Sequence, residues 1–277
     1  MKRNLLIFFL RNYLNTLAFV NPGKAGKEGF MLFCRPQRRA VKPHHLEFFN
    51  TAEKFTVEYD QKKVQAYRWG SGPKKLLLLH GWESHSYWWK SIVTHLPGEE
   101  FSVLSVDAPG HGLSEGNYIN IPHYSGLIEK LIITHGAFDG ILGHSLGAFS
   151  TLYTFHRAPQ LGNPKLIIMA APGEVSEFVS YYKNVLGLSD RTLNATRDYF
   201  ITKLGHDVNY FSSKAFAKTI SNPGLIIHDQ QDPDAPYAHA LEVHRNWPNS
   251  RMISTTGLGH NLKSTELIKE VARFLNT

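Results

Sequence analysis

The sequence of 277 residues contains one cysteine, Cys34. A single cysteine cannot form an intramolecular disulfide and cannot supply a cysteine-based metal cluster. Freedom from disulfides suits a reducing compartment, so we expect a cytoplasmic protein. The sequence contains neither a metal-binding motif nor a dinucleotide-binding fingerprint, and we expect no cofactor and no metal.

The sequence also lacks the run of about 20 apolar residues that a membrane-spanning helix needs. The start, MKRNLLIFFLRNYLNTLAFV, has the basic end and apolar run of a signal peptide. However, the run LLIFFL stops at Arg11 and no small-residue cleavage site follows. Export therefore stays a minor alternative. Apolar residues recur at nearly helical spacing from Leu6 to Leu17, which predicts an amphipathic helix.

The net positive charge comes from the N-terminal part. The net charge is +7, and residues 1–50 hold nine Lys or Arg against two Asp or Glu, so the rest of the chain is balanced. We therefore expect no nucleic-acid binding by the main domain. Residues 1–52 have two interpretations, either helices packed on the domain surface or a basic, apolar arm. Such an arm could contact an anionic membrane peripherally or cover the substrate entrance.

From residue 53 onward, strand and helix patterns alternate. Segments 53–60 and 63–70 predict a hairpin around Gln61 and Lys62, and continuous apolar runs predict strands buried on both faces. Such buried strands are expected at 74–81, 101–110 and 138–145, further strands at 165–172, 224–232 and 251–257, and helices at 121–136, 146–159 and 265–277. The alternation predicts an α/β fold with a mostly parallel central sheet and helices on both faces.

The alternation is interrupted once, between the strands at 165–172 and 224–232. The interval contains two segments of helical period, 175–188 and 191–205, and is too long to be a simple loop. We predict a small helical cap at about 174–220, inserted late into a domain that spans 53–277. The preceding residues 1–52 form a basic N-terminal extension, which we expect to be helical.

The segment Gly143-His144-Ser145-Leu146-Gly147 follows a predicted strand and opens a predicted helix. A strand-to-helix turn this tight leaves no room for side chains beside the serine, so small residues are required at 143 and 147. The turn raises the Ser145 hydroxyl above the sheet, where the helix N-terminus adds a positive dipole. We therefore predict that Ser145 is a nucleophile.

A serine nucleophile needs a base and a third group that orients the base. Fifteen histidines are present, and His260 is favoured because it follows the last predicted strand. Gly257 and Gly259 leave the backbone free to project its imidazole over the sheet edge. His144 is next to Ser145 in sequence, but adjacent side chains on a strand point to opposite faces.

Three aspartates, Asp229, Asp232 and Asp234, lie at or beyond the end of the apolar run that begins at Gly224, and they are candidates for the orienting acid. Asp232 is favoured because it lies on the loop and can reach back to the imidazole, with Asp229 second. Turn formation or helix capping is the alternative role for Asp229 and Asp234. The expected order along the chain is Ser145, Asp232, His260.

Attack by Ser145 makes the carbonyl oxygen of a substrate negative, so two backbone N–H groups are expected to face it. Leu146 follows the nucleophile and supplies one, and Trp82, in the turn after the strand 74–81, supplies the other. Trp82, Tyr87 and Phe178 are also candidates for the lining of an apolar substrate pocket. Core packing is the alternative for these aromatic side chains.

With these residues in place, the sequence resembles the α/β-hydrolase superfamily, most closely its bacterial esterase-like members. The resemblance covers roughly residues 55–277. Four motifs carry it in the family's order: HGW at 80–82, DAPGHGLS at 107–114, GHSLG at 143–147 and GLGH at 257–260.

The resemblance implies that Ser145 is the nucleophile, Asp232 the acid and His260 the base, and that Trp82 and Leu146 form the oxyanion hole. It implies a scaffold role for the 107–114 segment. Dehalogenases and epoxide hydrolases of this fold place an aspartate at the nucleophile position, so serine favours acyl chemistry.

Together these features predict a serine hydrolase that cleaves a small-molecule carboxylic ester through an acyl-enzyme intermediate. A thioesterase, an amidase and a carbon–carbon bond hydrolase share the triad and stay open as alternatives. A non-catalytic ligand-binding member is a further alternative. So is a membrane-surface lipase anchored through residues 1–50.

Overall fold

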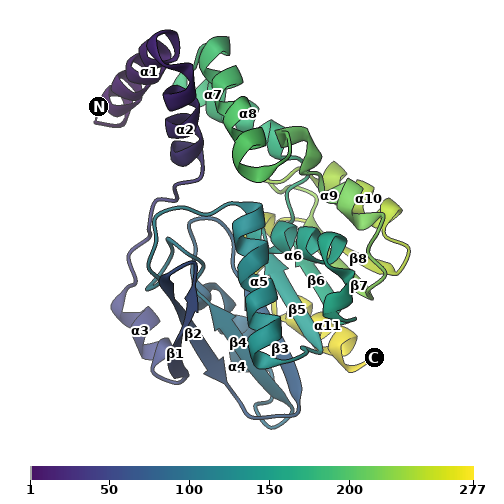
Figure 1. Ribbon diagram of the computed structural model, residues 1–277. Coiled ribbons are helices and arrows are strands. Elements are labelled where there is room, and N and C mark those ends of the chain that lie inside the picture. Colours follow the sequence, from purple (N-terminus) through teal and green to yellow (C-terminus); the bar gives the residue numbers. More distant parts are fainter. Residues whose placement is uncertain (1) are drawn as a thin grey trace. The chain divides into compact units, whose positions relative to one another are not determined.

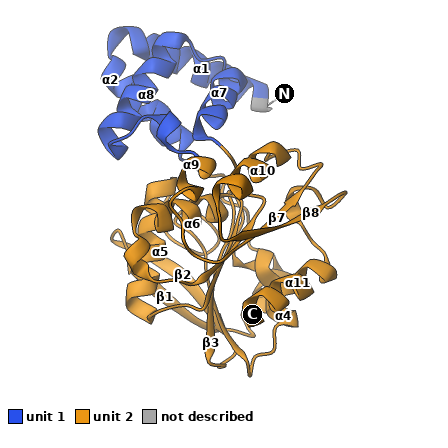
Figure 2. Cartoon of the chain, turned by 90° about the vertical axis from the view of Figure 1, so that its right-hand side faces the viewer, with its two compact units in different colours: residues 1–35, 174–212 blue, residues 36–173, 213–277 orange. Residues whose placement is uncertain are grey.

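The computed structural model describes residues 2–277, and the chain divides into two compact units (Figure 2). The smaller unit combines residues 1–35 with 174–212. The larger unit combines residues 36–173 with 213–277. Each unit is thus assembled from two stretches that are distant in the sequence.

The larger unit is built on one eight-stranded sheet with the order β1-β2-β4-β3-β5-β6-β7-β8 (Figure 1). β2 is antiparallel to β1 and β4, and every other neighbouring pair is parallel. This confirms the predicted α/β fold with a mostly parallel sheet. The strands are β1 Glu53–Tyr59, β2 Lys62–Trp69, β3 Lys74–Leu79, β4 Phe101–Val106, β5 Gly140–His144, β6 Lys165–Met169, β7 Gly224–Asp229 and β8 Ser250–Thr255.

The predicted hairpin is formed by β1 and β2, but its turn lies one residue earlier than expected. Asp60 and Gln61 occupy the turn with φ of 50° and 56°. A two-residue turn that matches the twist of its strands requires positive φ at both positions, and aspartate tolerates it better than most residues. Lys62 therefore begins β2 and pairs with Tyr59.

Helices cover both faces of the sheet, as predicted (Figure 2). One face carries α5 (Ile121–His135) and α6 (Leu146–Arg157), and the other carries α4 (Lys90–His95) and α11 (Thr265–Asn276). On the second face, apolar side chains of β3, β4, β5, β6 and β7 pack against α4 and α11 in one cluster. Because both faces are covered, the four leucines of β3 are fully buried.

The remaining elements of the larger unit are short. They are α3 Pro43–Phe49, α9 Ser213–Ala217 and α10 Tyr237–Asn246, with 3-10 turns at Ser86–Trp89, Pro159–Leu161 and Gly259–Asn261. The sequence patterns predict no helix at α4, α9 or α10. α10 buries only Ala240 and Val243, so its apolar stripe is too sparse to be recognised.

The smaller unit consists of four helices and a 3-10 turn: α1 Lys2–Val20, α2 Pro22–Phe33, α7 Val175–Leu186, α8 Asp190–Leu204 and Val208–Tyr210. α7 and α8 belong to the insertion between β6 and β7, which confirms that the late insertion is helical. Of the helices described for residues 2–277, none combines the length and apolarity needed to cross a membrane.

The side chain of Asn15 joins α1 to the α7–α8 connection. Its Nδ2 donates to the Gly187 carbonyl at 3.2 Å, and its Oδ1 accepts from the Ser189 N–H at 2.9 Å and the Thr192 hydroxyl at 2.8 Å. One amide therefore satisfies three polar groups at the start of α8. The N-terminal helices and the inserted helices are held in one unit by such contacts.

α2 crosses α8 at two glycines. A Cβ atom on Gly26 would lie 2.1 Å from the Ala195 carbonyl oxygen, and one on Gly29 would lie 2.4 Å from Thr196 Oγ1. Neither distance is compatible with a side chain, so these positions require glycine for the two helices to approach.

Gly26→Ala is expected to destabilise the smaller unit by about 1–3 kcal/mol, because the new methyl group overlaps a backbone carbonyl. Gly23→Ala in the same helix is the matched control. Its Cβ would meet only Asn21 Oδ1 at 3.8 Å, so stability should be unchanged or raised by up to about 1 kcal/mol. Urea unfolding followed by circular dichroism measures both variants. Equal stability of the two variants would contradict the close helix crossing.

Candidate active site

Ser145 lies between β5 and α6, at the strand-to-helix turn expected from the sequence. Its backbone has φ 52° and ψ −117°, a conformation that costs a non-glycine residue about 1–3 kcal/mol. The Ser145 N–H donates to the Met169 carbonyl on β6 at 2.9 Å, which ties the turn to the sheet. Such strain is typical of functional positions.

The positions two residues before and two residues after Ser145 accept no side chain. A Cβ on Gly143 would lie 2.6 Å from the Ala148 backbone, and one on Gly147 would lie 2.2 Å from the Leu79 carbonyl oxygen. The predicted need for small residues at 143 and 147 is therefore confirmed.

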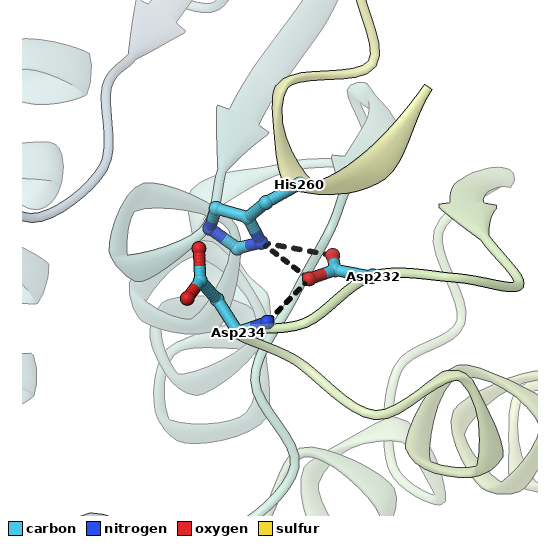
Figure 3. Close-up of side chains that lie close together, drawn as sticks. All are labelled: Asp232, Asp234 and His260. Carbon is cyan, nitrogen blue, oxygen red and sulfur yellow. Dashed lines mark hydrogen bonds and ion pairs between the residues drawn. The ribbon is translucent and has the colours of Figure 1, made fainter. Parts of the chain in front are cut away.

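Asp232 and His260 meet at the carboxyl edge of the sheet (Figure 3). His260 Nδ1 lies 2.8 Å from Asp232 Oδ2 and 3.1 Å from Oδ1. Asp232 Oδ1 also accepts the N–H groups of Asp234 at 2.8 Å and Ala235 at 2.9 Å. Burial acts to raise the pKa of Asp232, but the hydrogen bonds from His260, Ala235 and Asp234 outweigh it and hold that pKa below its usual value.

The ionised Asp232 determines the tautomer of His260. A carboxylate only accepts hydrogen bonds, so the proton of the neutral imidazole lies on Nδ1 and Nε2 is the basic nitrogen. This is the arrangement that a general base requires.

The structure does not join the predicted nucleophile to the predicted base directly. Within residues 2–277, His260 forms side-chain hydrogen bonds with Asp232 and none with Ser145. The two segments are nonetheless adjacent, because His144 Nε2 lies 2.8 Å from the His260 carbonyl oxygen and the two rings are 5.0 Å apart. A hydrogen bond between nucleophile and base is often long in an unliganded enzyme and tightens with substrate.

Sequence reasoning missed the part that His144 plays. Burial lowers the pKa of His144 to about 3, so the ring is neutral, and its Nε2–H donates to the His260 carbonyl. The ring also stacks on Trp88, with centroids 4.0 Å apart and planes 21° from parallel. His144 therefore anchors the loop that carries His260. Its place beside Ser145 was the only signal in the sequence.

His228 on β7 is a second histidine close to Asp232. Its Nε2 is 2.7 Å from the Ala235 carbonyl and 3.5 Å from Asp232 Oδ2, and both side chains are buried. Burial lowers the pKa of His228, so the ring is neutral near pH 7 and donates to Ala235. It thus fixes the loop that presents Asp232.

Asp229, the second candidate for the acid, has other partners. It accepts hydrogen bonds from Thr255 Oγ1 at 2.7 Å and from the N–H groups of Leu258 and Gln231 at 2.9 Å each. Burial acts to raise its pKa, but these hydrogen bonds outweigh burial and lower the pKa to about 2. Asp229 therefore holds the end of β8 and the start of the His260 loop.

Asp234 is exposed, and its carboxylate lies beside the His260 ring (Figure 3). Potential ligand atoms of Asp232, Asp234 and His260 lie within 4.8 Å of one another. Two carboxylates and an imidazole can hold a metal ion, but here Asp232 and His260 already bind each other.

The loop after β3 is shaped by His80. Its Nδ1–H donates to the Gly81 carbonyl at 2.8 Å, and its Nε2 accepts the Ala108 N–H at 2.9 Å. Burial lowers the pKa of His80 to about 3, so it keeps this neutral tautomer. A Cβ on Gly81 would lie 2.8 Å from Ser145 Cβ, so the loop and the serine turn are in close contact.

The backbone N–H groups of Trp82 and Leu146 are the predicted oxyanion donors. Neither donates a hydrogen bond to another group within residues 2–277, so both are available to a ligand. Trp82 directly follows Gly81, which touches the Ser145 side chain, and Leu146 opens α6. Their role stays a prediction.

The predicted pocket aromatics lie in different places. Tyr87 packs against α3, with its ring 4.0 Å from that of His45 and 5.8 Å from that of Phe48. Trp82 is partly exposed in the larger unit, and Phe178 is partly exposed on α7 of the smaller unit. The packing of Tyr87 fits the core alternative. Pocket lining by Trp82 and Phe178 stays a prediction.

A cavity of about 490 Å³ lies beside α3 and α4, over the ends of β2 and β4. Aromatic side chains Phe48, Trp69 and Phe101 line it together with Lys90 and Glu47. Neither the serine turn nor the Asp232–His260 pair contributes to its wall, so this cavity is not part of the candidate active site.

The sheet, its helices and the serine turn define the class of fold, which is the α/β-hydrolase fold. Within this class, the chain belongs to the family described as serine aminopeptidase S33, whose model matches residues 72–215, just over half of the chain. Residues 206–277 match a second family, described as TAP-like protein.

Curated relatives include an esterase of Mycobacterium tuberculosis, 29% identical over 116 residues, which are 39% of this chain and 37% of the relative. The match thus spans little more than a third of that relative. A pimeloyl-[acyl-carrier protein] methyl ester esterase of Nitrosomonas europaea is 24% identical over 234 residues, 69% of this chain and 90% of the relative.

A solved structure from Butyrivibrio proteoclasticus with bound ferulic acid has a TM-score of 0.64 at 19% identity, covering 79% of this chain and 98% of that chain. This likeness shows the fold. The family model and these relatives together place the chain in the α/β-hydrolase class.

Asp229 makes the stability of the larger unit depend on pH in the acid range. Its pKa falls from 3.8 to about 2 on folding, so its stabilisation is complete above about pH 4 and is lost as the pH falls through 2. Asp229→Asn should lower the melting temperature at neutral pH and flatten its acid dependence. Asp198→Asn, at an exposed carboxylate, is the control and should preserve the wild-type profile. Scanning calorimetry over the acid range tests this, and parallel profiles for wild type and Asp229→Asn would refute it.

His144→Ala should lower kcat by about 10- to 100-fold with a smaller change in KM, because the His260 loop loses its anchor. His144→Gln retains a donor for the His260 carbonyl and should recover most of the activity. Ester hydrolysis by both variants, with their melting temperatures, is the measurement. An inactive Gln variant with a native melting temperature would count against the anchoring role.

Proposed function

We propose that the chain is a serine esterase that cleaves a small-molecule carboxylic ester through an acyl-enzyme intermediate. Ser145 is the nucleophile, His260 the general base and Asp232 the group that orients it. The observation that carries this proposal is the partly buried hydrogen bond between Asp232 and His260 Nδ1, 2.8 Å long, beside a strained serine turn.

In the first step, Ser145 Oγ forms a bond to the carbonyl carbon of the ester, and its proton moves to His260 Nε2. The carbonyl π electrons move to oxygen and give a tetrahedral oxyanion. Asp232 remains ionised and stabilises the imidazolium that has formed, because its lowered pKa disfavours protonation.

The oxyanion accepts hydrogen bonds from the N–H groups of Trp82 and Leu146. Removal of one such donor typically costs about 10²- to 10³-fold in kcat. The N-terminus of α6 adds a favourable dipole at the same place.

The tetrahedral intermediate collapses when the carbon–oxygen bond to the alcohol breaks and His260 Nε2–H protonates the leaving oxygen. Water then attacks the acyl-enzyme, giving its proton to His260. Collapse of the second intermediate releases the carboxylic acid and returns the proton to Ser145.

An ester is the favoured substrate because both curated relatives described above are named esterases. The same residues would support hydrolysis of a thioester, an amide or a carbon–carbon bond. Nitrophenyl esters and matched acyl thioesters of increasing chain length distinguish ester hydrolysis from thioester hydrolysis.

Ser145→Ala is expected to abolish labelling by a fluorophosphonate probe and to lower ester hydrolysis by at least about 10³-fold, because no acyl-enzyme can form. The matched control is Ser150→Ala, which removes a buried hydroxyl from α6, the helix that follows Ser145, and should keep both labelling and activity. In-gel fluorescence and initial rates on nitrophenyl esters measure the two effects.

Wild-type protein that is folded but takes no label and hydrolyses no ester would overturn the proposal and favour a ligand-binding member of the family. Labelling that persists in Ser145→Ala would assign the nucleophile to another residue.

A further inference from the structure

Helix α1 carries large apolar side chains on its outer face. Leu5, Phe8, Phe9, Phe19 and Val20 have exposures between 49% and 80%. Phe8 and Phe9 follow Leu5 by three and four residues, and Phe19 and Val20 follow it by fourteen and fifteen, about four helical turns, so all five lie along one side of the helix. Exposed Asn12 and Thr16 lie on the same side between Phe9 and Phe19, and we refer to the five apolar side chains as the outer stripe.

The opposite face of α1 is already used. Leu14 and Ala18 are buried, and Leu14 clusters with Leu186 and Leu188 of the inserted segment. The outer stripe therefore is not explained by packing within the smaller unit. A helix that is apolar on both sides is normally covered on both sides, and exposed patches of this kind mark interaction surfaces.

Cationic groups flank one edge of the stripe. The Arg11 guanidinium lies 5.6 Å from the Phe8 ring centroid, and that of Arg191 lies 4.8 Å from the Phe19 centroid. Both arginines therefore stand beside the apolar side chains at the edge of the exposed face.

The sequence around α1 is also strongly basic. Residues 1–35 contain six Lys or Arg and a single acidic residue, Glu28. Glu28 lies 3.9 Å from Lys24, so its charge is partly compensated. The surface that fits the stripe is therefore apolar beneath an anionic layer.

We propose that α1 docks on an anionic lipid bilayer, lying in the interface with its outer stripe among the acyl chains. Arg11 and Arg191 then face the phosphate groups of the lipids. The helix lies on the membrane rather than across it, because its other face packs on α2, α7 and α8. A second copy of the chain is a poorer occupant, since it brings the same positive charge to the contact.

The test is flotation of the purified full-length protein with vesicles of phosphatidylcholine and phosphatidylglycerol, compared with phosphatidylcholine alone. We expect the protein to float with the anionic vesicles, to bind the neutral vesicles more weakly, and to be released by salt. Leu5→Gln combined with Phe9→Gln should weaken partitioning into the vesicles by about tenfold or more per residue, because each substitution removes an apolar side chain that enters the bilayer.

Ile133→Gln is the matched control, because Ile133 is 74% exposed on α5 of the larger unit. It should float like wild type. Both variants change exposed residues, so their melting temperatures should match that of wild type.

Three results would overturn the proposal. The first is wild-type protein that stays with neither kind of vesicle. The second is a double variant that floats as well as wild type. The third is dimerisation, seen by analytical ultracentrifugation without lipid and lost in the double variant, which would assign the stripe to a second copy. None of these readouts depends on the chemistry at Ser145.

Discussion

The site depends on how closely the backbone of three segments converges on Ser145. Gly143 and Gly147 face the start of α6 and the end of β3, and Gly81 faces the serine side chain itself. A single added methyl group at any of these glycines would force the segments apart. The strained φ of Ser145 persists because β5 is hydrogen-bonded between β3 and β6, which over-determines the turn.

Neutral histidines organise the loops around this turn. His80 joins the loop after β3 to Ala108, His144 holds the His260 loop, and His228 holds the Asp232 loop. An uncharged imidazole offers one donor and one acceptor, which suits a buried position between backbone groups. Burial lowers the pKa of each of these three rings, so near neutral pH they add no charge to the surroundings of Asp232 and His260.

The parts of the site that could be predicted follow from local patterns. Ser145, Asp232 and His260 each come shortly after a predicted strand, and parallel strands bring those positions to one edge of the sheet. The hairpin turn at Asp60 was misplaced by one residue because polar residues surround it and no glycine marks it. α10 was missed because it buries only two residues.

Other features depend on contacts that no local pattern contains. Nothing near His144 indicates that its ring reaches the His260 carbonyl, 116 residues away in the sequence. Likewise, Asn15 donates a hydrogen bond to Gly187, 172 residues away. Residue 26 must be glycine because a side chain there would overlap the Ala195 carbonyl. From the sequence, residues 1–52 and the inserted cap are expected to be separate segments. In the structure, residues 1–35 and 174–212 contact each other and form one compact unit.

This shared unit limits how the N-terminal helices can be studied. Leu14 and Phe30 pack on Leu186 and Phe200 of the inserted helices, so deletion of residues 1–35 would expose the apolar face of the insertion. A truncated protein would lose activity or aggregate whether or not α1 binds a membrane, because buried surface would be exposed to water. Substitutions on the exposed stripe leave Leu14 and Asn15 in place, and they therefore separate the surface role of α1 from its packing role.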